Sequence, residues 1–449
     1  MTERRGEALI AFIASAADRP LPPAVQDGAR RALADFLGLA VGAHDDAPVG
    51  PARRVAAAWK TAGGARAVMG SRMAPALAAL INGTAAHAMD FDDTHPMGGG
   101  HPSAPCWSAA LALAEDGGLT EELALRAFVT GYEIMARLGG GGPPGVGRAL
   151  QKAGFHPTSL FGRVGAAAAA CVLLRLNPAR IPHALGAAAT MAGGLVGSFG
   201  TDGKPFHAGK AAMDGIMAAQ LAAEGFVAAT HLFELDGGLL GTFLQRGLPE
   251  VVPPLDFDAA WEVLNNGFKP YASCRATHPA AEAAQGLAAR IGNRDIVAVT
   301  ARVHPDAMVV AGKLDPKTAL EAKFSVPFCV AMGLRGRALV ATDFHAGVAQ
   351  DPALRDLLPR IVCEVVAGQV PHTARVEVVL EDGERLANTV AVMTGHPDNP
   401  MGWDSLRRKF DGLAAPVLGA EKAGALFEEA RGFGTRPGAL GRISTLIAG

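Results

Sequence analysis

The sequence lacks the features that mark several specialised classes of protein. Its five cysteines are scattered and odd in number, which predicts a reducing compartment and no disulfide framework. Aromatic residues make up only 6% of the chain, and the formal net charge is −2, without a basic stripe. No apolar run has spanning length. We therefore expect neither nucleic-acid binding nor membrane insertion.

The N-terminus resembles a short secretory signal at first sight. Arg4 and Arg5 precede the apolar run ALIAFIASAA. Glu3 and Glu7 make this segment amphipathic, however, and residues 18–20 end it as they would end a helix. We therefore predict a cytoplasmic protein.

Small and apolar residues dominate the rest of the composition. Nearly half of the 449 residues are apolar, and alanine and glycine are abundant. Such a composition favours closely packed helices with small residues at their contacts. The chain is too long for one ordinary core, so two or three domains are expected from its length.

Helical apolar spacing dominates the chain as far as about residue 265. It recurs over residues 7–17, 23–42, 51–61, 119–138, 157–184, 185–197 and 214–229. The run GGGGPPG after residue 138 contains the spacing Gly-x-Gly-x-x-Gly, but it follows a helix and holds two prolines, so no dinucleotide site is predicted. No segment reads as a strand, which indicates an all-helical body.

The pattern changes after about residue 266. Residues 296–305 alternate like a strand, and residues 373–394 predict a hairpin around Asp382-Gly383. Helices are expected between them at 317–334 and 351–358, and again over 403–431. The predicted fold is mainly α: an all-helical domain of residues 1–265 and 403–449, and a smaller α+β domain of residues 266–402.

Residues 82–107, NGTAAHAMDFDDTHPMGGGHPSAPCW, gather acidic and imidazole side chains between two apolar helices. Residues 74–88 predict the first helix, and Ser103 is placed to cap the second, over 103–114. The stretch holds His87, Asp90, Asp92, Asp93, Thr94, His95 and His101. Helices can fix the geometry of such a loop while its polar tips stay exposed, which favours a proton-transfer site.

Two other interpretations of this stretch compete with proton transfer. A charged loop is more often a solvated connector whose aspartates cap helices. Aspartate and histidine are also metal ligands, but the stretch has neither His-x-x-x-His nor Cys-x-x-Cys spacing, so no metal site is predicted.

Two short segments add polar groups at expected helix starts. GFHPTS places His156 before a proline and a small-residue helix, where backbone amides favour an anion. TDGKPFHAGK places Lys204, His207 and Lys210 before an apolar helix, either as a cationic anchor for carboxylates or as a solvated cap. Its glycine spacing does not fit a nucleotide-binding P-loop.

The segment KPYASCRATH joins the two expected domains, where binding sites are frequent. Its polar side chains suit a polycarboxylate, although an ordinary polar linker is the plainer interpretation. The candidate binding residues are Lys269, Tyr271, Cys274, Arg275 and His278. No base is spaced to activate Cys274, so we predict no thiolate nucleophile there.

Taken together, these segments resemble the MmgE/PrpD family. The resemblance rests on NGTAAHAMDFDDTH with HPSAP, GFHPTS, GKPFHAGKAAMDGIMAAQLAAEGF and KPYASCRATH, and AKFSVPFCVAMGL, GHPDNPMGW and RRALADFLGLAVGA fit as well. It covers essentially the whole chain in order. Members include 2-methylcitrate dehydratases, cis-aconitate decarboxylases and iminodisuccinate epimerases. The resemblance implies a large helical domain, a smaller α+β domain, an active site between them and a homodimer.

The family's site residues map onto this chain one by one. The resemblance matches Asp90, Thr94 and His101 to the aspartate, threonine and histidine of the active-site loop. His156 matches the second histidine, Lys204 the lysine of the KPxHxG motif, and Lys269 the junction lysine. One position departs: the decarboxylase branch has a histidine where this chain has Cys274, which argues against decarboxylation of cis-aconitate.

These residues predict an enzyme that moves a proton at a carbon next to a carboxylate. In this hypothesis His101 and His156 are an acid/base pair near their operating pKa, and Asp90 orients one of them. Lys204 and Lys269 hold carboxylates, with help from Arg275. No cofactor is implied.

We predict a lyase similar to 2-methylcitrate dehydratase that acts on a di- or tricarboxylate. An isomerase similar to iminodisuccinate epimerase is the alternative, because both reactions use the same residue types. A non-catalytic, dimeric carboxylate-binding protein is the second alternative, although it would need cations without an acid/base pair.

Overall fold

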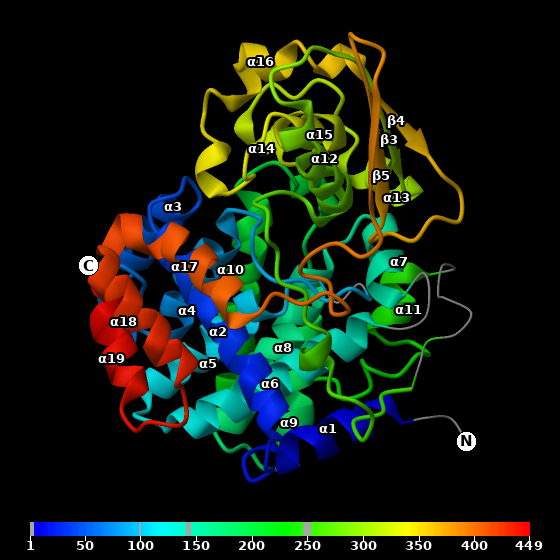
Figure 1. The fold of residues 1–449 in the computed structure, drawn as a ribbon. Coiled ribbons are helices and arrows are strands. Elements are labelled where there is room, and N and C mark those ends of the chain that lie inside the picture. The colour runs from blue at the N-terminus through cyan, green and yellow to red at the C-terminus, as the bar shows by residue number, and fades with distance from the viewer. Residues whose placement is uncertain (1–3, 98–99, 141–144, 246–251, 253) are drawn as a thin grey trace. The chain divides into compact units, whose positions relative to one another are not determined.

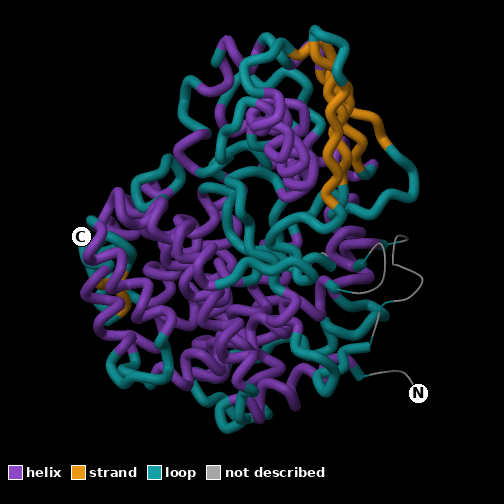
Figure 2. The backbone as a smooth tube through the Cα atoms, viewed as in Figure 1, coloured by secondary structure: helices purple, strands orange, loops and turns teal. Residues whose placement is uncertain are grey.

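The computed structural model describes residues 4–97, 100–140, 145–245, 252 and 254–449. The chain forms two compact units: unit 1 comprises Met1–Gly267 and Gly402–Gly449, and unit 2 comprises Phe268–Met401. Figure 1 labels their elements, and Figure 2 shows helices throughout unit 1 and the long strands in unit 2. The protein is mainly α, with a small mixed sheet. Residues 98–99 and 141–144, from the two glycine runs, lie outside the described part.

Unit 1 is built from helices whose apolar faces meet in one core. Its central helices α4, α5, α6, α8 and α10 pack against one another, and α2 packs against α4 and α17. The helices of unit 1 are α1 Arg5–Ala16, α2 Pro23–Gly42, α3 Val49–Ala58, α4 Pro75–Ala88, α5 Ser103–Asp116, α6 Glu121–Gly139, α7 Val146–Lys152, α8 Pro157–Leu173, α9 Ile181–Thr190, α10 Gly203–Ala223, α11 Leu239–Leu244, α17 Trp403–Leu418, α18 Ala420–Arg431 and α19 Ala439–Leu446.

The prediction that unit 1 is wholly helical is wrong in one place. A two-stranded antiparallel sheet pairs β1 Ala65–Arg66 with β2 Arg72–Met73. Each strand has only two residues, so neither produces a readable alternation. The Glu115 carboxylate accepts a hydrogen bond from the backbone N–H of Arg66 in β1, and Asn82 Oδ1 accepts one from Val68, which follows β1.

Several predicted helix boundaries are also wrong. The helix expected over 214–229 is α10, which begins at Gly203 and ends at Ala223, before Gly225 with φ +98°. Pro205 did not stop it, because proline is tolerated in the first turn. The helix expected over 157–184 ends at residue 173, and the segment 403–431 breaks at Gly419, which has φ +80°.

Small residues let the central helices of unit 1 approach closely, as the composition predicted. A Cβ on Gly83 of α4 would lie 2.8 Å from the Cα of Gly209 on α10. A Cβ on Gly209 would overlap the carbonyl oxygen of Leu80 and the hydroxyl of Thr84. This contact matters for the site because α4 and α10 both carry its residues.

We expect Gly209→Ala to destabilise unit 1. The new methyl group would push α10 away from α4, and overpacking of this kind costs about 1–3 kcal/mol. Urea unfolding would measure the loss. Gly197→Ala is the matched control, because a Cβ there meets nothing within 4 Å. Equal free energies of unfolding for the two variants would contradict this account of the helix contact.

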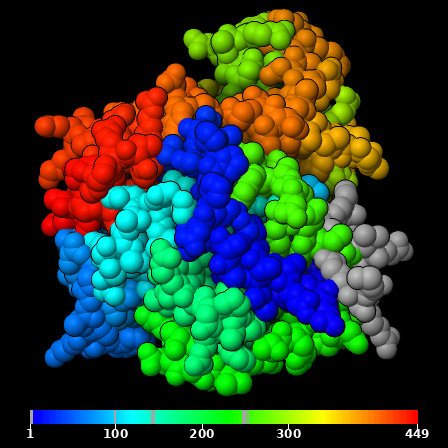
Figure 3. All heavy atoms as spheres, turned by 90° about the horizontal axis from the view of Figure 1, so that it is seen from below, coloured from blue at the N-terminus to red at the C-terminus, as the bar shows by residue number. Residues whose placement is uncertain are grey.

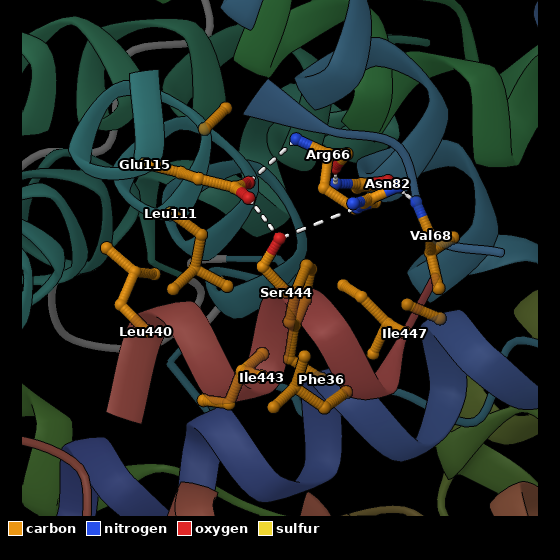
Figure 4. A pocket seen from close by; sticks show the side chains of 13 residues that line it. Phe36, Arg66, Val68, Asn82, Leu111, Glu115, Leu440, Ile443, Ser444 and Ile447 are labelled. Carbon is orange, nitrogen blue, oxygen red and sulfur yellow. Dashed lines mark hydrogen bonds between the residues drawn. The ribbon is translucent and has the colours of Figure 1, made fainter. Parts of the chain in front are cut away.

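The C-terminal helix α19 lines a small cavity of about 20 Å³ within unit 1 (Figure 4). Phe36, Leu111, Leu440, Ile443 and Ile447 line its apolar part, which has room for one water molecule. The Glu115 carboxylate accepts hydrogen bonds from the Arg66 backbone and the Ser444 hydroxyl. The cavity is structural and contains none of the predicted site residues.

The N-terminal segment, which includes helix α1, packs on another face of unit 1. Figure 3 shows it in blue across the surface seen from below. Helix α1 packs against α6, α8 and α9 through Leu9, Phe12 and Ile13, which are buried. Among the described residues no helix combines the length and apolar character that crossing a membrane requires.

Unit 2 is a four-stranded sheet with helices packed on it. The strand order is β4-β3-β5-β6, with β3 and β4 parallel and the other neighbours antiparallel. Helix α12 packs on β5 and β6, and α15 packs on α12 and β4. The elements are α12 His278–Ile291, β3 Ile296–Val303, α13 Pro305–Ala311, α14 Ala319–Ala322, α15 Val326–Leu334, α16 Pro352–Arg355, β4 Ile361–Val365, β5 Ala374–Leu380 and β6 Arg385–Val390.

Some elements of unit 2 agree with the prediction, and others differ from it. The hairpin turns at Asp382-Gly383, as predicted, and Gly383 has φ +82°. Strand β4 was missed because only Ile361 of its five residues is buried, so it shows no alternation. The helix expected over 317–334 is two shorter helices, α14 and α15, and the one expected over 351–358 is only α16.

Candidate active site

The centre of the candidate site is a buried ammonium group at the start of α10. Lys204 Nζ donates a hydrogen bond of 2.7 Å to Asp90 Oδ1 and lies 3.2 Å from Nε2 of His87. His87 comes from the last turn of α4, and all three side chains are buried. The close contact of α4 and α10 at Gly83 and Gly209 therefore sets the distance between lysine and imidazole.

Asp90 turns the chain out of α4 in a conformation that few residues adopt. Its φ is +53°, in the left-handed region, and its N–H bonds to the carbonyl of His87 at 3.4 Å. Aspartate tolerates this region better than most side chains. The left-handed turn places the carboxylate on Lys204. The carboxylate that contacts both His87 and His101 is that of Asp92, and the role of Asp90 in orienting a histidine stays a prediction.

Asp92 lies between two imidazole rings. Its Oδ2 is 2.7 Å from Nδ1 of His87, and its Oδ1 is 3.2 Å from Nδ1 of His101. Since Lys204 donates to Nε2 of His87, that ring carries its proton on Nδ1 and donates it to Asp92. The result is a continuous row of polar groups: Asp90, Lys204, His87, Asp92 and His101.

The loop that carries His101 is fastened to α8. The backbone N–H of His101 donates to Thr158 Oγ1 at 3.1 Å. Gly100 has φ +72° and passes so close to Thr158 that a Cβ would lie 2.8 Å from its backbone nitrogen. Thr94, the predicted binding threonine, is buried and pairs with Gly267 through two backbone hydrogen bonds of 2.8 and 2.9 Å.

Ser103 does not cap α5, which corrects the prediction. Pro102 is the N-cap residue, and the Ser103 hydroxyl donates to the carboxylate of Asp93. Asn266 Nδ2 donates to the same carboxylate at 2.6 Å. Burial raises the pKa of Asp93 to about 7, although both hydrogen bonds lower it. The buried carboxylate of Asp93 thus ties the loop to Ser103 and Asn266 through hydrogen bonds. The interpretation of the loop as a solvated connector is therefore wrong.

His156 and His207 form a second imidazole pair. His156 is the N-cap residue of α8, and His207 lies one turn after Lys204 on α10. Their Nδ1 atoms are 3.0 Å apart. The ring of His156 stacks on His87 at 5.8 Å and meets Phe199 edge-on at 4.9 Å. His87 in turn lies 4.5 Å from the ring of His101, so four imidazoles from three segments meet here.

Burial favours the neutral form of three imidazoles of the cluster, those of His87, His156 and His207. It lowers the pKa of His87 to about 3, with Lys204 adding to the effect and Asp92 opposing it. Burial and the charge of Lys204 hold the pKa of His156 well below its usual value. Burial, with Arg163, lowers the pKa of His207 to about 4. The pKa of His156 thus lies below the operating range that the acid/base hypothesis expects for it.

Asp92 keeps its negative charge despite being buried. Burial alone would raise its pKa, but the adjacent His101 and His87 rings outweigh burial and hold the pKa well below the usual value. His87, Asp92 and His101 are close enough together to hold a metal ion. The ammonium of Lys204, 3.2 Å from His87, opposes a cation at this position, and it supplies positive charge there itself.

His87 predicts how the stability of the fold depends on pH. Its folded pKa lies below the ordinary value of 6.5, so between these values the unfolded chain binds a proton that the native protein excludes. Stability is fully present above pH 6.5 and falls as the pH drops. Relative to His87→Asn, wild type should lose about 2 kcal/mol between pH 7 and pH 5. Urea unfolding of both proteins at each pH would test this, and a constant difference would contradict it.

The predicted binding residues of the segment 269–278 lie in unit 2. His278 Nε2 donates a hydrogen bond of 3.1 Å to the Ser273 carbonyl. The His278 ring meets the Tyr271 ring edge-on, with the ring centroids 5.2 Å apart. Arg275 donates to the Gly395 carbonyl at 3.4 Å. Cys274 donates its backbone N–H to the Lys323 carbonyl. The roles of these residues and of Lys269 in binding a carboxylate stay predictions.

Three residues of the cluster, His87, Asp92 and His207, were not among the predicted site residues. His87 and Asp92 were noted only as part of the polar stretch, because their contacts depend on the left-handed turn at Asp90. His207 follows Lys204 by three positions, which places both on one face of a helix. That spacing could have identified His207 if the helix had been predicted to begin at Gly203.

Comparison with known proteins places the chain in a family. The model of the MmgE/PrpD N-terminal domain matches residues 7–250, and that of the MmgE/PrpD C-terminal domain matches residues 271–431. The cis-aconitate decarboxylases of Mus musculus and Homo sapiens are each 29% identical over 366 and 364 residues; both alignments cover 77% of this chain, and 73% and 74% of those proteins. The cis-aconitate decarboxylase of Aspergillus terreus is 25% identical over 382 residues, covering 78% and 76%. The chain belongs to the MmgE/PrpD family.

Proposed function

We propose that this protein is a lyase that acts on a di- or tricarboxylate by moving a proton at a carbon next to a carboxylate. The observation that carries the proposal is the buried cluster in unit 1, where an ammonium group, two carboxylates and four imidazoles meet. Membership of the MmgE/PrpD family supports the same class of reaction, as do the relatives named cis-aconitate decarboxylase, which is a lyase.

The chemistry needs a base near the carbon and positive charge near the carboxylate. A proton on the carbon next to a carboxylate is only weakly acidic, because its removal leaves enolate-like negative charge on the substrate. Lys204 supplies positive charge, and the N-termini of α8 and α10 add their partial positive charge to it. A bound polycarboxylate would raise the pKa of the neighbouring imidazoles, so substrate itself would bring His156 towards its working range.

The two imidazole systems supply the acid and the base. His101 is polarised by Asp92, and His156 by its contact with His207. Lys204 would stabilise the developing negative charge, while Asp90 holds Lys204 in place. Lys269 and Arg275 keep their proposed role as carboxylate ligands, with Thr94, Tyr271, Cys274 and His278 as further binding residues. We propose no cofactor.

Dehydration, of the 2-methylcitrate dehydratase type, is our first candidate. It requires a base for the carbon proton and an acid for the leaving hydroxyl, which suits two separate imidazole systems. Decarboxylation of cis-aconitate is the second candidate, favoured by the names of the relatives. Cys274, at the position where the resemblance implies a histidine in decarboxylases, argues against it. The homodimer and the cytoplasmic location stay predictions.

A product screen would distinguish these reactions. The protein would be incubated with 2-methylcitrate, citrate, cis-aconitate and iminodisuccinate in D₂O, and water loss, carbon dioxide and inversion would be followed by NMR and gas detection. We expect loss of water from 2-methylcitrate and deuterium in the product. Carbon dioxide from cis-aconitate would favour the second candidate, and inversion without water loss would indicate the epimerase.

The control is a His101→Gln/His156→Gln double variant, which keeps Lys204 and its charge. Deuterium incorporation by wild type and not by this variant would tie the chemistry to the cluster. Binding of these acids without any exchange, loss or inversion would contradict the proposal and indicate a carboxylate-binding protein.

A further inference from the structure

The pair formed by His156 and His207 has a geometry that a single catalytic histidine does not require. The two Nδ1 atoms face each other at 3.0 Å, with the rings tilted by 48°. His156 is 3% exposed at the start of α8, whereas His207 is only half-buried, on the second turn of α10. The contact therefore leads from the interior of the cluster toward its edge.

Two neutral imidazoles this close share one proton. One Nδ1 carries hydrogen and donates, and the other accepts with its lone pair. If His156 donates, its Nε2 is a base; if His207 donates, Nε2 of His156 carries hydrogen and is an acid. His156 therefore changes from base to acid when its Nε2 gains a proton and its Nδ1 proton crosses the 3.0 Å to His207.

We propose that His207 is the second station of a proton relay that serves His156, which rests on the proposed function. Nε2 of His156 accepts the proton from the substrate carbon, and the electron pair of the broken C–H bond stays on the substrate. The proton on Nδ1 of His156 then passes to Nδ1 of His207. His156 is left neutral with hydrogen on Nε2, His207 becomes an imidazolium ion, and no charge is gained or lost.

The surrounding charges favour this direction of transfer. An imidazolium at His156 would be buried and face Lys204, His87 and His101. His207 also faces Lys204 and Arg163, but the Arg163 guanidinium is bound to the Asp214 carboxylate at 2.7 Å. Lys210 pairs with the same carboxylate. Because His207 is less buried, water solvates the positive charge better there than at His156.

Two substitutions separate proton transfer from mere support. His207→Asn keeps a hydrogen-bonding atom near the position of Nδ1 but cannot take up a proton, and His207→Ala removes the group. We expect both to lower kcat by about 10–10²-fold, within the usual contribution of one acid/base group, with KM unchanged. Wild-type turnover by His207→Asn would overturn the relay.

Chemical rescue is a readout that a purely structural role would not move. Imidazole added to His207→Ala should restore part of kcat, because the base fills the vacated, partly exposed position. Pyrazole has the same size and is a much weaker base, so it should restore nothing. Equal rescue by both compounds would show that only volume matters, and this would overturn the relay.

A measurement without turnover keeps this proposal separate from the proposed function. In wild type labelled with ¹⁵N-histidine, a coupling across the hydrogen bond should link Nδ1 of His156 with Nδ1 of His207, and His207→Asn should lose it. Absence of the coupling overturns the relay even in an active enzyme. Presence of the coupling in a protein that turns over none of the acids supports the relay geometry and contradicts the lyase.

Discussion

Asp92→Asn should lower turnover by about 10²–10⁴-fold, because it removes the charge that orients and polarises His101. In wild type the carboxylate lies 3.2 Å from Nδ1 of His101, and its charge favours the tautomer with hydrogen on Nδ1, in which Nε2 of that ring is the base. An asparagine must use one end of its amide for each histidine. If its oxygen stays with His87, its NH₂ group faces His101 and stabilises the wrong tautomer.

The unit formed by Asp92 and His101 can be tested by a double-mutant cycle. His101→Gln should cause a loss of similar size, and Asp92→Asn/His101→Gln should lose little more than either single variant, because residues that act together are not additive. Steady-state kinetics on the substrate found in the screen would measure all four proteins. Multiplied losses in the double variant would show that the two residues act independently. Urea unfolding checks that each variant is folded.

Lys204→Met should destabilise unit 1 by about 3–5 kcal/mol, because it removes the ammonium group that pairs with the buried carboxylate of Asp90. It also removes the hydrogen bond to Nε2 of His87. Activity should be lost as well, since no positive charge would stabilise the developing enolate. Thermal and urea unfolding of wild type and variant would measure the first effect.

Two further variants make this prediction specific to the buried pair. Asp90→Asn/Lys204→Met removes both charges and should recover part of the stability, because no uncompensated charge remains. Lys210→Met is the matched control on the same helix: its partner Asp214 keeps Arg163, so the loss should stay below about 1 kcal/mol. Equal losses for Lys204→Met and Lys210→Met would contradict the importance of the pair with Asp90.

Local patterns in the sequence predicted the elements that local physics dictates. Helix α2 has the predicted bounds, because an apolar face of period 3.6 follows a proline in the first turn. The hairpin of β5 and β6 follows from alternation around Asp382-Gly383. Strands β1 and β4 were not predictable in this way, because their pairing partners lie elsewhere in the chain and their own residues carry no period.

The sequence by itself determined a mainly helical fold with small residues at its contacts, the family, and the kinds of group in the site. It also determined that His101, His156, Asp90 and Lys204 belong among the candidates. Only the tertiary structure decided that Asp90 binds Lys204, that Asp92 joins His87 to His101, and that His207 meets His156. The reason is that these contacts depend on a left-handed turn at Asp90 and on how closely α10 approaches α4, and no pattern within a single segment contains either.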